Sequence, residues 1–378
     1  MIFACTQENL LQGLSLVGHI ATKNANLPIL NNVLMKVEDG NLKLSTTNLE
    51  MAVSALVRGR AEGAGEFTVP AKLLQDYVNL LPTGKVELAV KDDVLEVRAD
   101  GRVTQIKGMT ASEFPLIPKL AKEAGYKLNV QILREAIAQV VFAVSASESR
   151  PELSGVSCYF HGVAGQDRCV MAATDSYRLA ERTFALVPGG PSKESRCIVP
   201  ARAMQEVMRI LSAYKDDVGM PQEVEWSLAD NQFVLTYGKV ELISRLIEGS
   251  FPDYKQIIPQ QFRTKLTVAR SELAKAIRAA SLFTRQGLYD VHLEYKADGT
   301  FDVSSADTGT GAHTTHLQVE SEMAEPNKVT LNFKYVADGL SAAATDKVTI
   351  HMIDAMNPVV IMPKEGVEFQ YVVMPIRQ

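Results

Sequence analysis

Two sequence patterns each occur three times along the chain, and this repetition constrains the fold more than any other feature. The first pattern, a short apolar stretch that runs into an amphipathic helical pattern, begins at Phe3, Leu128 and Leu266. The second, of the same kind, begins at Phe67, Cys197 and Leu331. In both series the copies are about 125 to 140 residues apart and keep the same order, which is typical of a repeated structural unit. The sequence therefore predicts three copies of one plan.

Between the helical patterns the chain has the alternation expected of antiparallel hairpins. Asp39-Gly40 and Asp298-Gly299 each separate two segments in which apolar and polar residues alternate. Asp-Gly is a strong hairpin signal because both turn residues are expected to take positive φ. Similar paired segments lie at 86–98 and 223–237. Each unit is therefore predicted to be α+β, with two helices packed on antiparallel sheets.

Two stretches, 119–126 and 258–264, link the repeats. They predict domains at 1–120, 127–256 and 264–378, and each of these is long enough to bury a core of its own.

The sequence has the features expected of a cytoplasmic protein. No apolar run approaches the roughly 18 residues needed to cross a bilayer, and the N-terminus lacks the basic-then-apolar order of a signal peptide. The net charge of −5 weighs against a static nucleic-acid binder, although basic residues gathered on one surface stay compatible with it. The cysteines form no C-x-x-C pair and are expected to be free thiols: Cys5, Cys158, Cys169 and Cys197.

No residue pattern indicates an enzyme. His313 and His316 are close in sequence, but without a nearby Cys or Glu they indicate a polar strand rather than a metal site. Asp175 beside Arg178 is typical of a turn or a local ion pair. The Gly-Thr-Gly at 309–311 lacks the Lys-Ser/Thr of a phosphate loop and its strand-to-helix context. We therefore expect no catalytic residues, no metal and no cofactor.

Seven short motifs occur in order along the whole chain: LPIL at 27–30, TTNLEMAV at 46–53, VPAKLL at 69–74, SEFP at 112–115, ATDSYRLA at 173–180, EGSFPDY at 248–254 and YVVMPIR at 371–377. Each is weak alone, but the ordered set is specific, and with it the chain resembles the β subunit of bacterial DNA polymerase III. The resemblance implies a sliding clamp, a non-catalytic processivity factor for the replicative polymerase. Such a clamp is a head-to-tail dimeric ring of DNA-clamp domains, with helices inward and sheets outward, and it encircles double-stranded DNA without sequence specificity.

The resemblance also implies a peptide-binding groove between the second and third units. In the family, this groove takes a short peptide with a Gln and apolar anchors from polymerase subunits, the clamp loader and repair proteins. The positions here that match the groove are Leu153, Thr174, Ser176, Tyr177, Arg178, Leu179, Pro252, Ile257, Asn332, Tyr335, Val372, Met374, Pro375, Ile376 and Arg377.

Basic residues recur on the predicted helices. In the helix expected at 270–285, Lys275 and Arg278 lie opposite an apolar face, and Arg202 and Arg209 share one face of the helix after Pro200. A solvated helix face is the usual explanation for one such stripe, but recurrence together with the resemblance favours DNA. The residues expected to face DNA are Lys23, Asn24, Lys72, Arg150, Arg202, Arg209, Lys275 and Arg278.

The resemblance implies a homodimer contact between the edge strand at 103–107, including Ile106, and Leu282 and Phe283 of the other chain. Three features depart from the family pattern: Ser176-Tyr177 replaces a more familiar Gly-His, the chain ends on polar Gln378, and 306–316 replaces an acidic stretch. The alternative function is a clamp-fold peptide-binding scaffold that does not encircle DNA.

Overall fold

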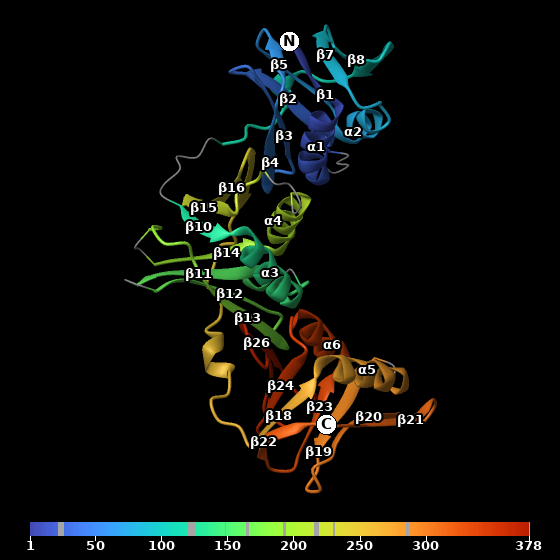
Figure 1. The fold of residues 1–378 in the computed structure, drawn as a ribbon, viewed down its shortest axis with the longest axis vertical. Helices are drawn as coiled ribbons and strands as arrows, with labels where there is room; N and C mark the ends of the chain where they lie inside the picture. Colours follow the sequence, from blue (N-terminus) through green and yellow to red (C-terminus); the bar gives the residue numbers. More distant parts are fainter. Residues whose placement is uncertain are drawn as a thin grey trace. The chain divides into compact units, whose positions relative to one another are not determined.

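The computed structural model describes residues 1–21, 26–118, 125–147, 149–163, 166–191, 194–214, 219–229, 231–284 and 287–377 (Figure 1). The chain forms two compact units, Met1–Val130 with Glu206–Leu246, and Gln131–Gln205 with Ile247–Gln378. The boundary between them therefore runs through the second sequence repeat. Among the described residues, no helix is long and apolar enough to cross a membrane.

The first unit holds a five-stranded and an eight-stranded sheet, with strand orders β5-β1-β7-β8-β9 and β10-β15-β16-β17-β4-β3-β2-β6. Its strands are β1 (Ile2–Thr6), β2 (Asn32–Glu38), β3 (Asn41–Thr47), β4 (Met51–Val57), β5 (Arg60–Glu62), β6 (Gly65–Pro70), β7 (Lys85–Lys91), β8 (Val94–Ala99), β9 (Arg102–Lys107), β10 (Tyr126–Asn129), β15 (Glu223–Ala229), β16 (Gln232–Tyr237) and β17 (Val240–Arg245). The helices α1 (Gln7–Val17) and α2 (Ala71–Asn79) lie side by side in this unit (Figure 1).

The second unit holds a nine-stranded and a four-stranded sheet, with orders β14-β11-β12-β13-β26-β25-β24-β18-β22 and β21-β20-β19-β23. Its strands are β11 (Gly155–Val163), β12 (Gln166–Thr174), β13 (Arg178–Ala185), β14 (Ser195–Pro200), β18 (Thr264–Ala269), β19 (Asp290–Tyr295), β20 (Phe301–Asp307), β21 (Gly311–Leu317), β22 (Glu320–Ala324), β23 (Asn327–Asn332), β24 (Lys347–Met352), β25 (Val359–Pro363) and β26 (Glu368–Val373). The helices are α3 (Val130–Val140), α5 (Arg270–Ala280) and α6 (Phe333–Ala342), and α4 (Ala201–Ala213) spans the boundary between the units.

The order of elements confirms three α+β repeats. Each repeat runs strand, helix, three strands, strand, helix, three strands, with β5 and β22 as additions in the first and third. The strands β9, β17 and β26 are therefore equivalent, and so are β4, β13 and β21. Inside the chain these two classes pair with each other, β17 with β4 and β26 with β13, so each long sheet is shared by two consecutive repeats.

The predicted hairpin turns differ in detail. Asp39 and Gly40 both take positive φ, 49° and 76°, as expected of a two-residue hairpin turn. At the second Asp-Gly only Gly299 does, with φ of 88°, because this turn is longer and closes through a hydrogen bond from Lys296 N–H to the Thr300 carbonyl (2.9 Å). The helix expected at 270–285 ends as an α-helix at Ala280 and continues as a 3₁₀ turn, η7 (Ser281–Phe283).

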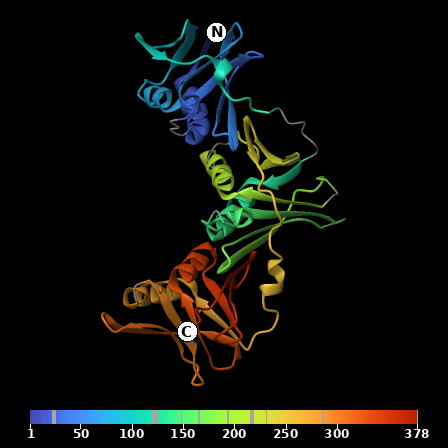
Figure 2. The same ribbon diagram turned by 180° about the vertical axis from the view of Figure 1, so that it is seen from behind.

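The segment between β17 and β18 packs against the nine-stranded sheet of the second unit. Its short helix η6 (Tyr254–Ile257) lies on the side of that sheet away from α5 and α6 (Figure 2). Phe251, Tyr254 and Ile258 contact a buried cluster that includes Leu179 of β13 and Val372 of β26. This segment therefore covers the place where the second and third repeats share a sheet.

All four cysteines are buried and free, as predicted. Burial raises the pKa of Cys5 to about 12, so its thiol stays protonated at neutral pH. The thiols therefore act as small apolar side chains in the cores.

Candidate functional site

A tight turn between β12 and β13 carries the residues that depart from the family pattern. Asp175 accepts hydrogen bonds from the backbone N–H groups of Tyr177 (2.9 Å) and Arg178 (3.0 Å), and Thr174 accepts one from Ser176 N–H (3.1 Å). Ser176 has a φ of 79°, a conformation that glycine adopts without strain and other residues rarely adopt. The turn leaves the Tyr177 side chain 64% exposed. Its shape is therefore compatible with the Gly of the family and is held here by side-chain caps.

Arg178 fixes this turn to its surroundings. Its side chain forms ion pairs with Asp175 (3.0 Å) and with Asp338 of α6, and it donates to the Phe142 carbonyl (2.8 Å). The guanidinium also lies 4.7 Å from the centre of the Tyr335 ring, within cation–π range. Because its donors are occupied, Arg178 positions the site rather than offering a free charge to a ligand.

Tyr371 of β26 supports the same region from beneath. Its ring packs against Gly339 of α6, where a Cβ atom would come within 2.2 Å of the ring. Burial raises the pKa of the Tyr371 phenol, which stays protonated and donates to the Tyr335 carbonyl (2.9 Å). Tyr371 therefore joins β26 to α6 through ring packing and a hydrogen bond.

A hollow of about 530 Å³ opens beside this turn in the second unit. Met374 N–H donates to the Tyr177 carbonyl (2.9 Å) and Ile376 N–H to the Thr330 carbonyl (2.8 Å), so the C-terminal tail forms one wall. Eight residues predicted for the groove line the hollow: Ser176, Tyr177, Asn332, Tyr335, Met374, Pro375, Ile376 and Arg377.

Three further lining residues, Gly287, Leu288 and Tyr289, were missed by the sequence prediction. Leu288 and Tyr289 are 47% and 38% exposed, and Lys334 lies 3.5 Å from the centre of the Tyr289 ring. Two large apolar side chains in a short loop were the available signal, because such residues rarely stay exposed without a partner.

The other predicted groove residues lie elsewhere in the second unit. Thr174, Leu179 and Val372 are buried, and Leu179 and Val372 are cross-strand neighbours in the nine-stranded sheet. These residues support the site from the core. Leu153 is buried in a 3₁₀ turn, Pro252 is half-buried, and Ile257 is 45% exposed at the end of η6.

Seven of the eight residues predicted to face DNA fall into three groups. Arg202 and Arg278 are exposed, with no ion pair among the described residues. Lys72, Lys275 and Arg150 are exposed but paired with Asp76 (2.8 Å), Glu272 (2.9 Å) and Glu152 (3.1 Å) on their own elements; pairs of this kind are weak and open readily. Lys23, Asn24 and also Arg285 and Gln378 lie outside the described residues.

Arg209 corrects the sequence prediction. It pairs with Glu206 (2.6 Å) and donates to the carbonyls of Ser15 (3.1 Å) and Leu16 at the end of α1. Glu206, with a side chain only 3% exposed, also contacts His19 at 2.7 Å. Arg209 therefore joins the helices of two repeats inside the first unit, and its donors are not available to DNA.

Ile106, predicted for the homodimer contact, lies within the core of its own unit. Its side chain is 3% exposed and belongs to the core of the first unit, because alternate residues of β9 face inward. Val103 on the same strand is 60% exposed. In the second unit Leu282 is 73% exposed, and Phe283 stacks on His313 with ring centres 5.7 Å apart.

The sequence matches three domains of one protein family: the N-terminal domain of the DNA polymerase III beta subunit over residues 1–118, the central domain over 127–253 and the C-terminal domain over 255–377. The chain belongs to the DNA polymerase III beta subunit family. The beta sliding clamp of a Synechocystis species is 29% identical, with 100% of this chain and 99% of that protein covered. The Staphylococcus aureus beta sliding clamp is 27% identical over 93% of this chain and 92% of that protein.

Solved structures of beta subunits are similar over the whole chain. The DNA polymerase III beta subunit of Pseudomonas aeruginosa has a TM-score of 0.89 and is 26% identical, with full coverage of both chains. That of Thermotoga maritima has a TM-score of 0.90 and 26% identity, covering 100% of this chain and 99% of that one. The clamp fold predicted from the sequence is thus confirmed.

Proposed function

We propose that the protein is the sliding clamp of a replicative DNA polymerase: a non-catalytic cytoplasmic ring of two chains that encircles duplex DNA and holds partner proteins through a peptide-binding groove. Its three clamp domains are the repeats at 1–120, 127–256 and 264–378. Family membership supports the clamp function, and the observation that carries the ring is the pair of free sheet edges described next.

The five-stranded sheet of the first unit ends at β9, and the four-stranded sheet of the second unit ends at β21. The equivalents of these two strands pair at both junctions within the chain, β17 with β4 and β26 with β13. A free β9 and a free β21 are therefore the two halves of a third junction of the same kind. Because they belong to the first and third repeats, a second copy joined head to tail can use both edges in both chains and close the assembly.

Exposed apolar side chains on the helix that contacts β9 support this contact: Thr104 of β9 donates a hydrogen bond to the Tyr77 hydroxyl of α2 (2.7 Å). Leu80, the C-cap residue of α2, is 77% exposed, whereas its equivalent in α4, Ile210, is fully buried. Leu73 of α2 is 54% exposed, and its equivalent Ala203 is fully buried. Single exposed leucines are ordinary, but two on one helix, at positions that are buried in the equivalent helix, indicate a surface that a partner covers. We propose that Leu282 of the second copy packs there, in place of Ile106 at the edge.

The DNA-facing surface we propose is narrower than the sequence predicts. Arg202 and Arg278 are exposed and have no ion-pair partner among the described residues. Three further cations can exchange their surface ion pairs for phosphate contacts: Lys72, Lys275 and Arg150. A few weak contacts suit a protein that must move along DNA, because each phosphate contact adds a salt-dependent attraction that opposes sliding.

The hollow beside the 174–178 turn is the groove we propose for partner peptides. It combines exposed aromatic rings with flexible Met374, and methionine adapts its packing to different ligands. Because Leu288 and Tyr289 add to its apolar wall, we expect an apolar anchor of the peptide to lie between them and Tyr177.

Removing residues 374–378 is expected to weaken the binding of a peptide with one Gln and two apolar anchors by at least about tenfold. A central apolar contact contributes roughly 1–2 kcal/mol or more to such binding. The melting temperature should change little, because the tail is half-exposed and contributes two backbone hydrogen bonds. Fluorescence anisotropy with the labelled peptide measures the affinity. Tyr177→Ala should act in the same direction, while Met356→Ala, an exposed apolar residue outside the hollow, is the control. Unchanged affinity in the truncated protein contradicts this site.

A clamp-fold scaffold that binds peptides without encircling DNA is the second candidate, favoured only by the net charge of −5. It shares the groove, so peptide binding does not separate the two functions. Retention on circular DNA separates the two functions.

A further inference from the structure

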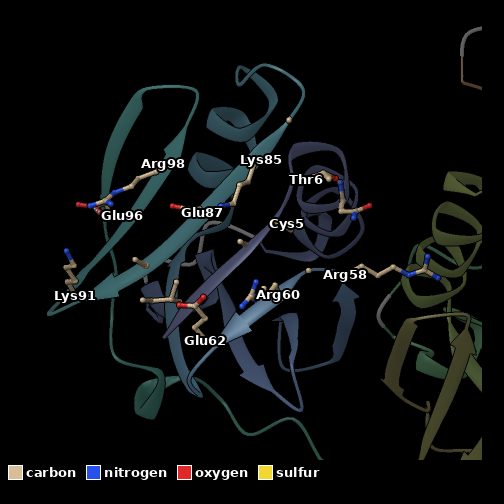
Figure 3. Close-up of a pocket in the computed structure, with 16 residues that line it drawn as sticks. Cys5, Thr6, Arg58, Arg60, Glu62, Lys85, Glu87, Lys91, Glu96 and Arg98 are labelled. Atoms are coloured by element: carbon tan, nitrogen blue, oxygen red, sulfur yellow. Dashed lines mark hydrogen bonds and ion pairs between the residues drawn. The ribbon is translucent and has the colours of Figure 1, made fainter.

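A second hollow, of about 890 Å³, lies on the five-stranded sheet of the first unit (Figure 3). Its floor consists of short or apolar side chains at the centre of the face. In the register of the sheet, Ala4 lies between Arg60 and Glu87, and Ile2 lies between Glu62 and Ala89. Long charged side chains surround these small ones, and this difference in length creates the hollow.

The rim of this hollow has an excess of positive charge. Five Lys or Arg residues and three Glu residues line it. Lys85 pairs with Glu87 at 2.5 Å, and Arg98 pairs with Glu96 at 2.6 Å. This leaves the cations Arg58, Arg60 and Lys91 without an ion pair in the part of the chain that the structure describes.

Figure 3 shows how the charged side chains are distributed: Arg60 and Glu62 lie on one side of the hollow, and Lys91, Glu96 and Arg98 lie on the other. Ile2 on the floor between them is 46% exposed. An apolar floor between two charged sides fits an extended segment better than a compact ion.

On the equivalent face of the third repeat, two lysines form ion pairs with carboxylates of the same repeat. There the added strand β22 supplies Glu320 and Glu322, which pair with Lys347 of β24 (2.6 Å), the strand on the other side of β18, and with Lys364 (3.1 Å). In the first repeat the corresponding strand is β5, only three residues long, and it adds Arg60 as well as Glu62. No such carboxylate pairs with Arg58, Arg60 or Lys91 among the described residues of the first repeat, in a chain whose net charge is −5.

We propose that this hollow binds an acidic peptide segment of a partner protein, with one apolar side chain of the peptide on Ile2, Ala4 and Ala89 and its carboxylates on Arg58, Arg60 and Lys91. Charge complementarity favours an acidic segment, and the exposed floor provides the apolar contact that gives affinity. A nucleic-acid strand fits less well because its backbone carries a phosphate at every residue, whereas the floor of Ile2, Ala4 and Ala89 is uncharged. The site is on the first unit, so it is separate from the proposed groove on the second.

The test uses the full-length protein and a fluorescein-labelled octapeptide in which Leu-Phe is flanked by three glutamates on each side. We expect saturable binding that weakens at least about tenfold in Arg58→Glu/Arg60→Glu, because two attractive charges become repulsive. The affinity should also fall at least about threefold between roughly 50 and 200 mM NaCl, since the contacts are exposed to solvent. Lys127→Glu/Lys239→Glu, with the same charge change at exposed residues elsewhere in the first unit, should bind as the unaltered protein does.

Three comparisons identify what is bound and where. Replacing Leu-Phe with Gly-Gly in the peptide should weaken its binding, and replacing its Glu residues with Lys should abolish binding. Deletion of 374–378 from the protein should leave peptide binding unchanged. The proposal is overturned by a dissociation constant weaker than about 1 mM, by equal loss in both charge-reversal variants, by dependence on the 374–378 tail, or by a single-stranded oligonucleotide that binds this hollow more tightly than the peptide.

Discussion

Replacing Leu80 with glutamate should convert the dimer into a monomer without unfolding either unit. In the single chain the Leu80 side chain is 77% exposed, so glutamate at this position meets solvent in the monomer. In the proposed assembly the same position is buried, as the equivalent Ile210 is within the chain. Burying an unpaired carboxylate at both contacts of a closed ring should raise the dimer dissociation constant at least about 100-fold. Sedimentation velocity over a concentration series measures this change.

Two controls separate assembly from folding. Leu116→Glu introduces the same change at a residue that is 92% exposed and belongs to no strand or helix, and it should leave the dimer intact. Ile106→Asp should instead unfold the first unit, because Ile106 is 3% exposed. A Leu80→Glu protein that sediments as the unaltered protein does would show that α2 is not in the contact.

Glu206→Gln should destabilise the first unit by about 3 kcal/mol, because removing one partner of a buried ion pair leaves the other uncompensated. The carboxylate of Glu206 accepts from Arg209 through both Nε (3.0 Å) and Nη2 (2.6 Å), and it contacts His19 Nδ1 at 2.7 Å. Glutamine keeps the shape but presents an amide N–H₂ to at least one of these donors. Urea unfolding followed by the fluorescence of Trp226, the single tryptophan and fully buried in this unit, reports the loss.

Asp76→Asn is the matched control, since Asp76 of the same unit pairs with Lys72 at 2.8 Å but its side chain is 58% exposed. It should change stability by less than about 0.5 kcal/mol. If the two variants unfold at the same urea concentration, the cluster around Glu206 does not hold α1 and α4 together.

The repeats were predictable because they depend on periodic burial. The positions of Leu10, Leu14 and Val17 in α1, all buried, follow the helical spacing that the sequence displays. The Asp39-Gly40 turn was predictable because few residues other than Gly, Asn and Asp adopt positive φ readily. Both signals are local, and local signals can be read along the chain.

The errors arose where a residue's partner lies far away in sequence. Arg209 has the spacing of an exposed basic stripe, but carbonyls of α1, 193 and 194 residues earlier, occupy its donors. Ile106 lies on an edge strand, and only the packed structure shows that its side chain faces inward. Leu288 and Tyr289 belong to no periodic element, so their place in the groove depends on tertiary contacts that the sequence does not display.

The same reasoning applies to the sharing of sheets between repeats. Sequence repetition predicts three similar domains, but not that β17 completes a sheet with β4 across a repeat boundary. Strand pairing over this distance follows from the tertiary fold, and it is this pairing that identifies β9 and β21 as complementary edges.

Retention on DNA tests the central claim most directly. The protein is loaded onto a nicked circular duplex by its clamp loader, filtered at a salt concentration that abolishes binding of the unloaded protein to short linear duplex, and measured again after one restriction cut. A ring held by topology stays on the circle at this salt and runs off once the circle is linear, because its contacts with phosphates are few and salt-sensitive. Equal retention on the circular and the linear DNA, or no retention on the circle, would contradict the account.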